Sequence, residues 1–259
     1  MEERLGARRK SGMTAANLRT WGMFMLIVGV VGKCIFQNTL AGLHSSNMQD
    51  LLSWMSESDA NMGYVTVAII ALFVETGAVP IFAFLTYLGF THTSDFSKYL
   101  LRVVGVALVS EIPYNLAMDG KLLAMDSRNP VFAVVLCLVV LWFFKRYAER
   151  GIKNFLLKLV ISFAAVVWAE MLRIQFGTPM LLVTLALWIC RNKPNFRNLV
   201  AGCAAMACTL ISPFYLVSPM AFLAVHGYND EQGEQNRLVN YLIYPVLLVA
   251  VYLFGTFVI

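Results

Sequence analysis

Ionisable side chains within long apolar runs are the residues of this sequence that could carry chemistry. Lys33, Glu75, Arg102, Glu111 and Glu170 each lie inside such a run or at its end. An ionisable group at membrane depth costs several kcal/mol, so each is a candidate for a function. Acid–base catalysis and electrostatic stabilisation are the chemistry that such groups perform when they face a cavity.

Four of these residues also have a structural interpretation. Lys33 and Glu75 could form an interhelical ion pair that fixes packing. Arg102 and Glu170 could extend their charged ends to opposite membrane interfaces. Both interpretations compete with a functional one, and the sequence alone leaves the alternatives open.

Glu111 lies two residues before Pro113 near the outer end of its apolar run. A site lining an outward-facing cavity and a structural role are equal alternatives for this residue. Arg102 precedes it by nine residues, which is about 13.5 Å and two and a half turns of helix. The two side chains are therefore expected on roughly opposite faces of one helix, where they would not pair.

The three histidines are not spaced as metal ligands. None of His44, His92 and His226 has a second His or a Cys at ligand spacing, so no metal site is expected. His92 lies in the turn FTHTSDFSKY, where a solvated histidine and a general base are the alternatives. No Gly-rich phosphate loop, nucleophile elbow or Ser/His/Asp arrangement is present. The residues alone thus predict buried charges but no particular reaction.

The elements that must position these groups are predicted by composition. The 259 residues are 59% hydrophobic and 14% charged, with a mean hydropathy of +0.69. Soluble domains are about 45–50% apolar and about 25% charged, so a water-soluble enzyme with a single core is excluded. The five cysteines all lie in apolar runs and match no metal or redox spacing.

The apolar runs predict an all-α, polytopic transmembrane helical bundle of about eight spans, because an open sheet cannot satisfy its backbone in lipid. Residues 1–20 form a basic cytoplasmic N-terminal tail without a cleavage site, and residues 21–259 form a single transmembrane domain. The expected spans are 21–41, 64–90, 99–118, 130–146, 154–172, 176–190, 198–225 and 238–259.

The distribution of basic residues orients these spans. Lys and Arg total 15 on one side and 4 on the other, with Lys33 inside a span, and cytoplasmic loops carry the excess. Eight spans with both termini cytoplasmic fit this count. Pro213 and Pro219 could instead divide 198–225 into two short helices, which would move the C-terminus outside. The net charge of +5 is thereby assigned to membrane orientation, and no nucleic-acid partner is expected.

Several strings, in order from about residue 18 to 255, resemble the TraX family of bacterial integral membrane proteins, whose founding activity is acetylation of a pilin N-terminus in conjugation. The stretch 77–118 is similar to the densest family motif, which contains Pro-Ile-Phe-Ala-Phe, His-Thr and Ser-Glu-Ile-Pro-Tyr. Further similar strings are Ser127-Arg128-Asn129 with Phe132, Phe176-Gly177, Tyr228-Asn229 through Gly233, and Tyr241 to Pro245.

The resemblance implies a multi-pass acyltransferase of the bacterial plasma membrane. Such a protein would move an acetyl or other acyl group from acyl-CoA, as a substrate rather than a bound cofactor, to a protein, sugar or lipid acceptor. Among the family-like polar residues, Glu111 is the candidate acid–base group and Arg102 the electrostatic contributor. His92 and Asn129 also remain, although His92 and Glu111 are expected on opposite membrane faces. The acceptor and the oligomeric state stay open.

Departures from the family pattern support a second hypothesis. Gly29 and Val30 stand where many members carry Asp-His, and Thr76, Gln175 and Leu247 replace Arg, Asp and His. The alternative is therefore a non-enzymatic membrane subunit that binds lipid or a partner, with a transporter as a third choice. An acyltransferase predicts a polar cavity, whereas the subunit predicts an interior packed shut around Glu75 and Lys33.

Overall fold

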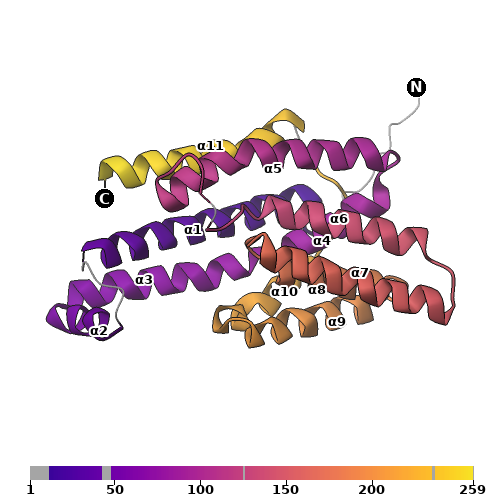
Figure 1. Ribbon diagram of the computed structural model, residues 1–259, viewed down its shortest axis with the longest axis horizontal. Helices are drawn as coiled ribbons and strands as arrows, with labels where there is room; N and C mark the ends of the chain where they lie inside the picture. The colour runs from indigo at the N-terminus through magenta and orange to yellow at the C-terminus, as the bar shows by residue number, and fades with distance from the viewer. Residues whose placement is uncertain (1–11, 43–47, 125, 235–236, 259) are drawn as a thin grey trace, which may run out of the picture.

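A computed structural model describes residues 12–42, 48–124, 126–234 and 237–258. Within these ranges the regular structure is helical, apart from two isolated bridges, which confirms the all-α prediction (Figure 1). The elements are α1 (Ala15–Gly42), α2 (Met48–Glu57), α3 (Asp59–Thr76), α4 (Ala78–His92), α5 (Phe96–Asp119), α6 (Val131–Arg146), α7 (Ile152–Met171), α8 (Gly177–Ile189), α9 (Pro194–Ala207), η1 (Cys208–Leu210), η2 (Pro213–Met220), α10 (Ala221–His226) and α11 (Arg237–Val258).

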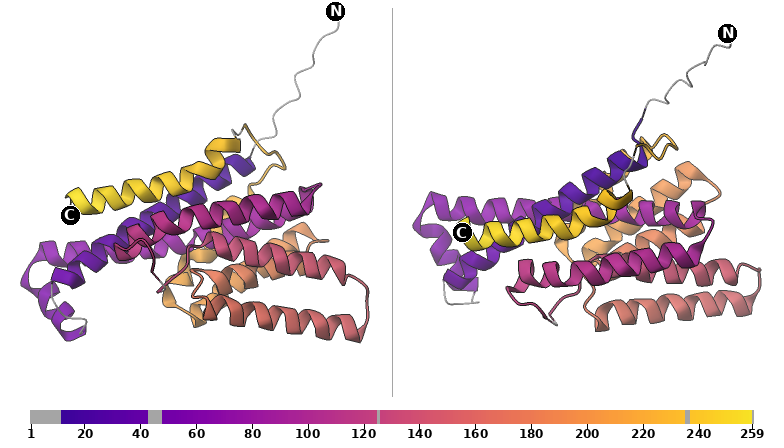
Figure 2. Two further views of the ribbon diagram at one scale, coloured as in Figure 1. Left: turned by 45° about the horizontal axis from the view of Figure 1, so that its top comes forward. Right: turned by 90° about the horizontal axis from the view of Figure 1, so that it is seen from above.

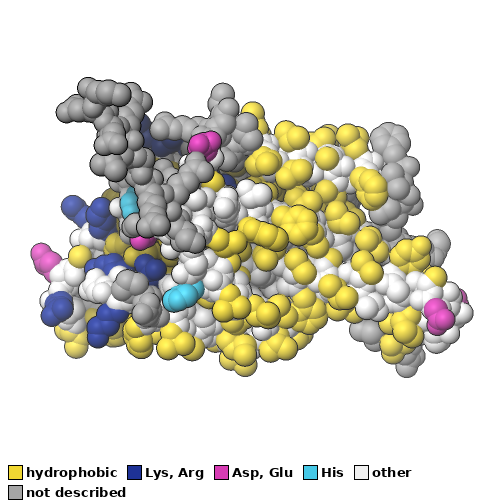
Figure 3. All heavy atoms as spheres, turned by 180° about the vertical axis from the view of Figure 1, so that it is seen from behind, with side chains coloured by type: hydrophobic (Ala, Val, Ile, Leu, Met, Phe, Trp, Pro, Cys, Tyr) yellow, Lys and Arg dark blue, Asp and Glu magenta, His cyan; other side chains and the backbone are white. Residues whose placement is uncertain are grey.

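Four runs in the described part of the chain are long and apolar enough to cross a membrane: Ala15–Ile35, Asp59–His92, Phe96–Asp119 and Ile152–Met171. The second run joins α3 to α4 through Gly77, whose backbone stays helical. Shorter apolar helices lie among them: Gly177–Ile189, Phe196–Leu210, Pro213–His226 and Leu242–Phe254. Lys and Arg side chains gather at one end of the bundle, and hydrophobic side chains cover the surface beyond it (Figure 3). This end, which includes the α4–α5, α6–α7 and α8–α9 connections, is called the basic end below.

The helices begin and end differently from the expected spans near the N-terminus. α1 begins at Ala15, so the last residues of the expected basic tail are already helical, and residues 1–11 lie outside the described ranges. The segment 43–63, expected as a loop, contains α2 and the start of α3. Ser58 lies between α2 and α3. Its side chain accepts a hydrogen bond from the Ala60 N–H, so Ser58 is the N-cap that begins α3.

Residues 198–225 fold as a hairpin, which agrees with the alternative that Pro213 and Pro219 divide the segment into two short helices and not with a single span. The chain leaves the basic end in α9, turns at Ser212, where the backbone is extended, and returns through η2 and α10. Near the turn, the Thr76 hydroxyl donates to the Phe214 carbonyl at 2.8 Å, in the middle of the α3–α4 run. On its return, the Gly227 carbonyl accepts from the Met13 N–H at 2.7 Å, beside the start of α1.

The hairpin places the two ends of the helical chain at opposite ends of the bundle. α11 starts near the basic end and runs parallel to α5, so that Tyr244 and Leu248 share a buried cluster with Tyr114 and Met118. Its last turns lie far from the start of α1 in each view (Figures 1 and 2). The start of α1 and the end of α11 therefore lie at opposite ends of the bundle, as in the alternative with a divided 198–225 and not as in the eight-span expectation, because the hairpin does not cross the bundle.

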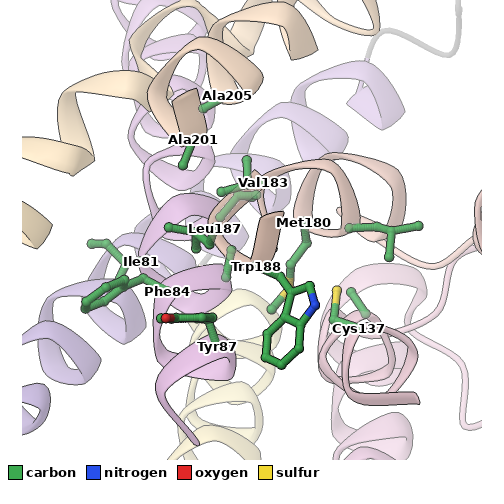
Figure 4. Close-up of a cluster of buried hydrophobic side chains, with 14 of the residues drawn as sticks. Ile81, Phe84, Tyr87, Cys137, Met180, Val183, Leu187, Trp188, Ala201 and Ala205 are labelled. Atoms are coloured by element: carbon green, nitrogen blue, oxygen red, sulfur yellow. The ribbon is translucent and has the colours of Figure 1, made fainter. Parts of the chain in front are cut away.

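The main hydrophobic core lies among α4, α6, α8 and α9 (Figure 4). α8 presents Met180, Val183, Leu187 and Trp188 to its neighbours, and α9 contributes the small residues Ala201 and Ala205 that let the helices approach. Trp188 packs edge-on against Phe90 of α4, with ring centroids 5.4 Å apart. α8 is therefore an internal helix, whereas only 11% of α7 is buried.

Two glycines of α1 allow it to approach α3 closely, and one ion pair links the two helices. A side chain at Gly29 would collide with the Glu75 side chain, and one at Gly32 would collide with Ala71. The close approach brings the Lys33 ammonium to 2.7 Å from the Glu75 carboxylate. The Glu75 side chain is 3% exposed and that of Lys33 is 23% exposed, so the predicted interhelical ion pair is present and largely buried.

The hairpin predicts which sites face the same side of the membrane. Single cysteines placed at Lys193 and Glu234 in a cysteine-free background should react with a membrane-impermeant maleimide from one side, since both flank the hairpin at the basic end. A cysteine at Leu122 and a tag after α11 should be accessible only from the other side. Labelling of intact spheroplasts and of inverted vesicles measures this, and opposite sidedness for residues 193 and 234 would contradict the hairpin.

The ion pair predicts a characteristic pattern of stabilities. Lys33→Met leaves the buried Glu75 carboxylate without its cation, which should lower the free energy of unfolding by about 3–5 kcal/mol. Lys33→Met with Glu75→Gln removes both charges and should recover most of this loss. Asp126→Asn, which breaks the exposed pair with Arg173, is the control and should match the wild type. Reversible chemical unfolding in detergent micelles measures the series, and a single variant as stable as the double variant would contradict the prediction.

Candidate functional site

A cavity of about 580 Å³ opens near the basic end of the bundle. It lies between α1, α4, α5 and α6, and the segment 228–232 closes one side. Polar and charged side chains from the basic end line one part of it: Arg19, His92, Thr93, Ser94, Arg102 and Asp230. Apolar and aromatic side chains line the deeper part, among them Phe82, Val131, Phe176, Met180 and Tyr244. Mostly apolar walls with a few convergent polar groups are typical of a ligand site.

The turn between α4 and α5 positions the polar part of this cavity. Thr93 ends α4 in an extended conformation, and its N–H donates to the Gly89 carbonyl. Asp95 is the N-cap of α5 because its carboxylate accepts from the Lys98 N–H at 3.1 Å. Hydrogen bonds from the Lys98 side chain and backbone hold the pKa of the Asp95 carboxyl below its ordinary value. Hydrogen bonds therefore hold the backbone on both sides of the α4–α5 turn.

His92 is oriented by its own helix. Its Nδ1 lies 2.9 Å from the Leu88 carbonyl oxygen, one turn earlier in α4. A carbonyl oxygen only accepts hydrogen bonds, so Nδ1 carries the proton when the ring is neutral. The lone pair is then on Nε2, which makes this exposed ring a proton acceptor at the edge of the cavity. The structure therefore places His92 in the cavity lining with Nδ1 turned toward its own helix.

Arg102 lines the same cavity from α5. Its Nε donates to the Lys98 carbonyl at 3.1 Å, which anchors the guanidinium one turn from the start of the helix. Tyr99 lies beside it, and its hydroxyl approaches α4 so closely that a side chain at Gly89 would collide with it. The α4–α5 turn thus brings a histidine and an arginine to one cavity, although ten residues separate them in the sequence.

Glu111 is absent from the lining of this cavity and lies in a different environment. Its carboxylate accepts hydrogen bonds from Arg128 Nη1 at 2.9 Å, from the Asn129 N–H at 3.2 Å and from Asn129 Nδ2 at 2.7 Å. Asn129 is fully buried and also donates to the Ala107 carbonyl. These contacts fasten the α5–α6 connection to α5, which is a positioning role. A catalytic role for Glu111 stays a prediction.

A chain of buried polar groups crosses the bundle near the deep part of the cavity. Gln175 Nε2 donates to Glu75 at 2.9 Å, and the Tyr114 hydroxyl donates to Gln175 Oε1 at 2.6 Å. The Ser127 hydroxyl lies 3.1 Å from the Tyr114 hydroxyl and can donate to it. Together with Lys33, this polar chain links α1, α3 and α5 to the α5–α6 and α7–α8 connections. Sequence reasoning found its charged members and missed the link through Tyr114, for which the only signal was a polar residue beside Pro113.

Phe176 separates this polar chain from the cavity. Its ring lines the cavity, and the Lys33 ammonium lies 5.4 Å from the ring centroid. Its backbone is left-handed, with φ 60°, which costs a residue with a Cβ about 1–2 kcal/mol. Backbone hydrogen bonds that pair Arg128 with Arg173 and Gln175 hold the segment in place. A strained residue between a cavity and a buried charge pair is typical of a functional site.

The residues that depart from the family pattern surround the same polar chain. Gly29 leaves the space that the Glu75 side chain fills, and Val30 is buried beside it. Thr76 donates to the hairpin, as described above, and Gln175 is a member of the chain. Leu247 packs against the cluster that contains Tyr114. The Glu75 side chain of α3 therefore fills the space that Gly29 leaves on α1.

The remaining candidates lie apart from the cavity. Glu170 is exposed and accepts a hydrogen bond of 2.5 Å from Thr178 Oγ1, which ties the end of α7 to the start of α8. His226 ends α10 and is exposed, and His44 lies outside the described residues. Within the described ranges, no three His, Cys, Asp or Glu side chains are grouped so that they could hold a metal ion.

Comparisons with known proteins identify the family but add no relative. The family model described as "TraX protein" matches residues 51–255 of the chain, which includes the cavity-lining parts of α4, α5 and α6. Comparison with curated proteins found no match, and comparison with solved structures found none. A match over most of the 259 residues, on an apolar helical bundle, establishes that the chain is a membrane protein that belongs to the TraX family.

Proposed function

We propose that this protein is a membrane acyltransferase that moves an acyl group, acetyl in the simplest case, from acyl-CoA to an amine or hydroxyl of a protein, sugar or lipid. The observation that carries the proposal is the cavity of about 580 Å³ that has both His92 and Arg102 in its lining. Family membership supports the same reaction class. Acyl-CoA is a substrate in this proposal, and no bound cofactor is invoked.

The residues of the cavity match the needs of acyl transfer. Nε2 of His92 accepts the proton of the attacking amine or hydroxyl as the new bond to the acyl carbon forms. The guanidinium of Arg102 stabilises the oxyanion that develops on the thioester carbonyl. The carbon–sulfur bond then breaks, and the proton passes from His92 to the leaving CoA thiolate. The apolar part of the cavity holds the acyl group away from water, which would otherwise hydrolyse it.

The distribution of charge supports an orientation for this reaction. Lys and Arg gather at the end of the bundle where the cavity opens (Figure 3), and positively charged ends face the cytoplasm. We therefore place α1's start and the cavity mouth on the cytoplasmic side of a bacterial plasma membrane, with the lipid bilayer around the apolar surface. Acyl-CoA is made in the cytoplasm, so this orientation gives the donor direct access.

One observation favours the non-enzymatic alternative. The interior around Glu75 and Lys33 is closed, and the residues that replace the family's polar positions are packed there. A subunit that only binds a lipid or a partner would keep this packing and need no base in the cavity. The two functions differ in what substitution of His92 should do.

The acyltransferase predicts a specific effect of His92→Asn. This change removes the proton acceptor but keeps a polar side chain, so it should lower kcat by about 10²–10⁴-fold while the affinity for acetyl-CoA changes little. Arg102→Gln should lower kcat as well. Thiol release from acetyl-CoA, with a panel of amine and hydroxyl acceptors and the protein in nanodiscs, measures the rates.

His226→Asn is the matched control, because it changes the other described histidine at the basic end and should leave the rate unchanged. Glu111→Gln separates the two roles of that residue: loss of stability with normal kcat per folded protein supports positioning. A folded wild-type protein that neither binds acetyl-CoA nor releases thiol would overturn the acyltransferase and leave the non-enzymatic subunit.

A further inference from the structure

A second cavity, of about 370 Å³, lies beside the first one at the basic end. Phe90, Phe96 and Trp142 form its aromatic part, and Lys145 and Arg146 form its charged part. The two cavities share Thr93 and Ser94 of the α4–α5 turn in their linings. The two cavities therefore adjoin at this turn.

The aromatic part presents a flat surface. The Trp142 and Phe96 rings are nearly parallel, at 13°, with centroids 6.4 Å apart. Phe90 meets Phe96 edge-on at 5.5 Å, which holds the Phe96 ring in its orientation. Trp142 is 42% exposed, with Phe143 edge-on to it at 4.9 Å, so part of the indole is accessible to a planar ligand. Stacking on such a face does not depend on the identity of a base.

The charged part comes from the last turn of α6. Lys145 and Arg146 are both exposed, and the Lys145 ammonium lies 5.7 Å from the Phe90 ring centroid. Two acids lie close in the sequence: Asp95, which is paired with Lys98 at 3.0 Å, and Glu149, which is exposed in the turn after α6. Two cations beside an aromatic surface favour an anionic, planar ligand, because guanidinium and ammonium groups bind phosphate oxygens through charge-assisted hydrogen bonds.

We propose that this second cavity binds the phosphorylated nucleoside end of the acyl-CoA donor. The adenine ring stacks on Trp142, and the phosphates contact Lys145 and Arg146. The pantetheine arm then crosses the turn at Thr93 and Ser94 and delivers the thioester to the cavity that contains His92. This inference rests on the proposed function, and it adds the subsite that selects a nucleotide-bearing donor over a simple acyl thioester.

Membrane orientation alone explains basic residues at this end, but it does not explain an aromatic cavity beside them. The test therefore compares two pairs of exposed cations with equal charge. Lys145→Ala with Arg146→Ala alters the second cavity, whereas Arg150→Ala with Lys153→Ala removes the same charge from the neighbouring turn and the start of α7. Trp142→Leu removes the stacking surface. Titration calorimetry on the full-length protein in phosphatidylcholine nanodiscs measures the affinities for adenosine 3′,5′-bisphosphate and for acetyl-CoA. Thermal unfolding verifies that each variant is folded.

We expect adenosine 3′,5′-bisphosphate to bind and to compete with acetyl-CoA. The Lys145/Arg146 double variant and Trp142→Leu should each lower the affinity for both ligands at least tenfold. The Arg150/Lys153 double variant should change these affinities less than threefold. Equal weakening by the two pairs, or acetyl-CoA binding that the bisphosphate does not displace, would overturn the subsite and leave the acyltransferase standing. Binding of the bisphosphate without acetyl-CoA would overturn the acyltransferase but keep a nucleotide site, and binding of neither would overturn both.

Discussion

The buried carboxylate of Glu75 is the constraint around which the bundle is arranged. A charge at this depth needs a cation and hydrogen-bond donors, because neither water nor lipid can supply them there. Lys33 supplies the cation from α1, and Gln175 supplies a donor from the α7–α8 connection. Gly29 makes room for the side chain, and Tyr114 extends the network to α5. One acid thus fixes the positions of helices that are distant in the sequence.

The surroundings of Glu75 and the basic end are held together by different kinds of hydrogen bonds. Around Glu75 the hydrogen bonds of Lys33, Gln175 and Tyr114 each join different elements, so movement of one helix would leave a buried group unpaired. At the basic end, the α4–α5 turn holds His92 and Arg102 by hydrogen bonds within their own helices. Their hydrogen bonds are therefore independent of the interhelical network, whereas Phe176 and Tyr244 contact both parts.

Much of the fold could be predicted from the sequence, and the reasons for the failures are physical. Composition and apolar runs predicted a helical membrane protein, and the cost of buried charge predicted the Lys33–Glu75 pair. Hydropathy measures how apolar a segment is but not its direction, so it left a single span and two short helices as alternatives for 198–225. Pro213 and Pro219 were the signal for the turn found at Ser212, and the single-span alternative alone misplaces the end of α11. For the site, the family-like polar residues gave Glu111, Arg102 and His92 as candidates, with Glu111 as the acid–base group, but the turn between α4 and α5 brings only His92 and Arg102 to the cavity. The contacts of Glu111 with Arg128 and Asn129 depend on a loop whose path has no local signal.

The hairpin of α9, η2 and α10 also has a consequence for biogenesis. Both of its ends stay at the basic end, so none of its polar flanks has to be translocated when the protein is made. Its tip, however, is held by the Thr76 hydroxyl, which exists as a docking point only after α3 and α4 are in the membrane. We therefore expect insertion to follow an order: the long helices integrate during synthesis, and the hairpin enters the assembled bundle afterwards from the side on which it was synthesised.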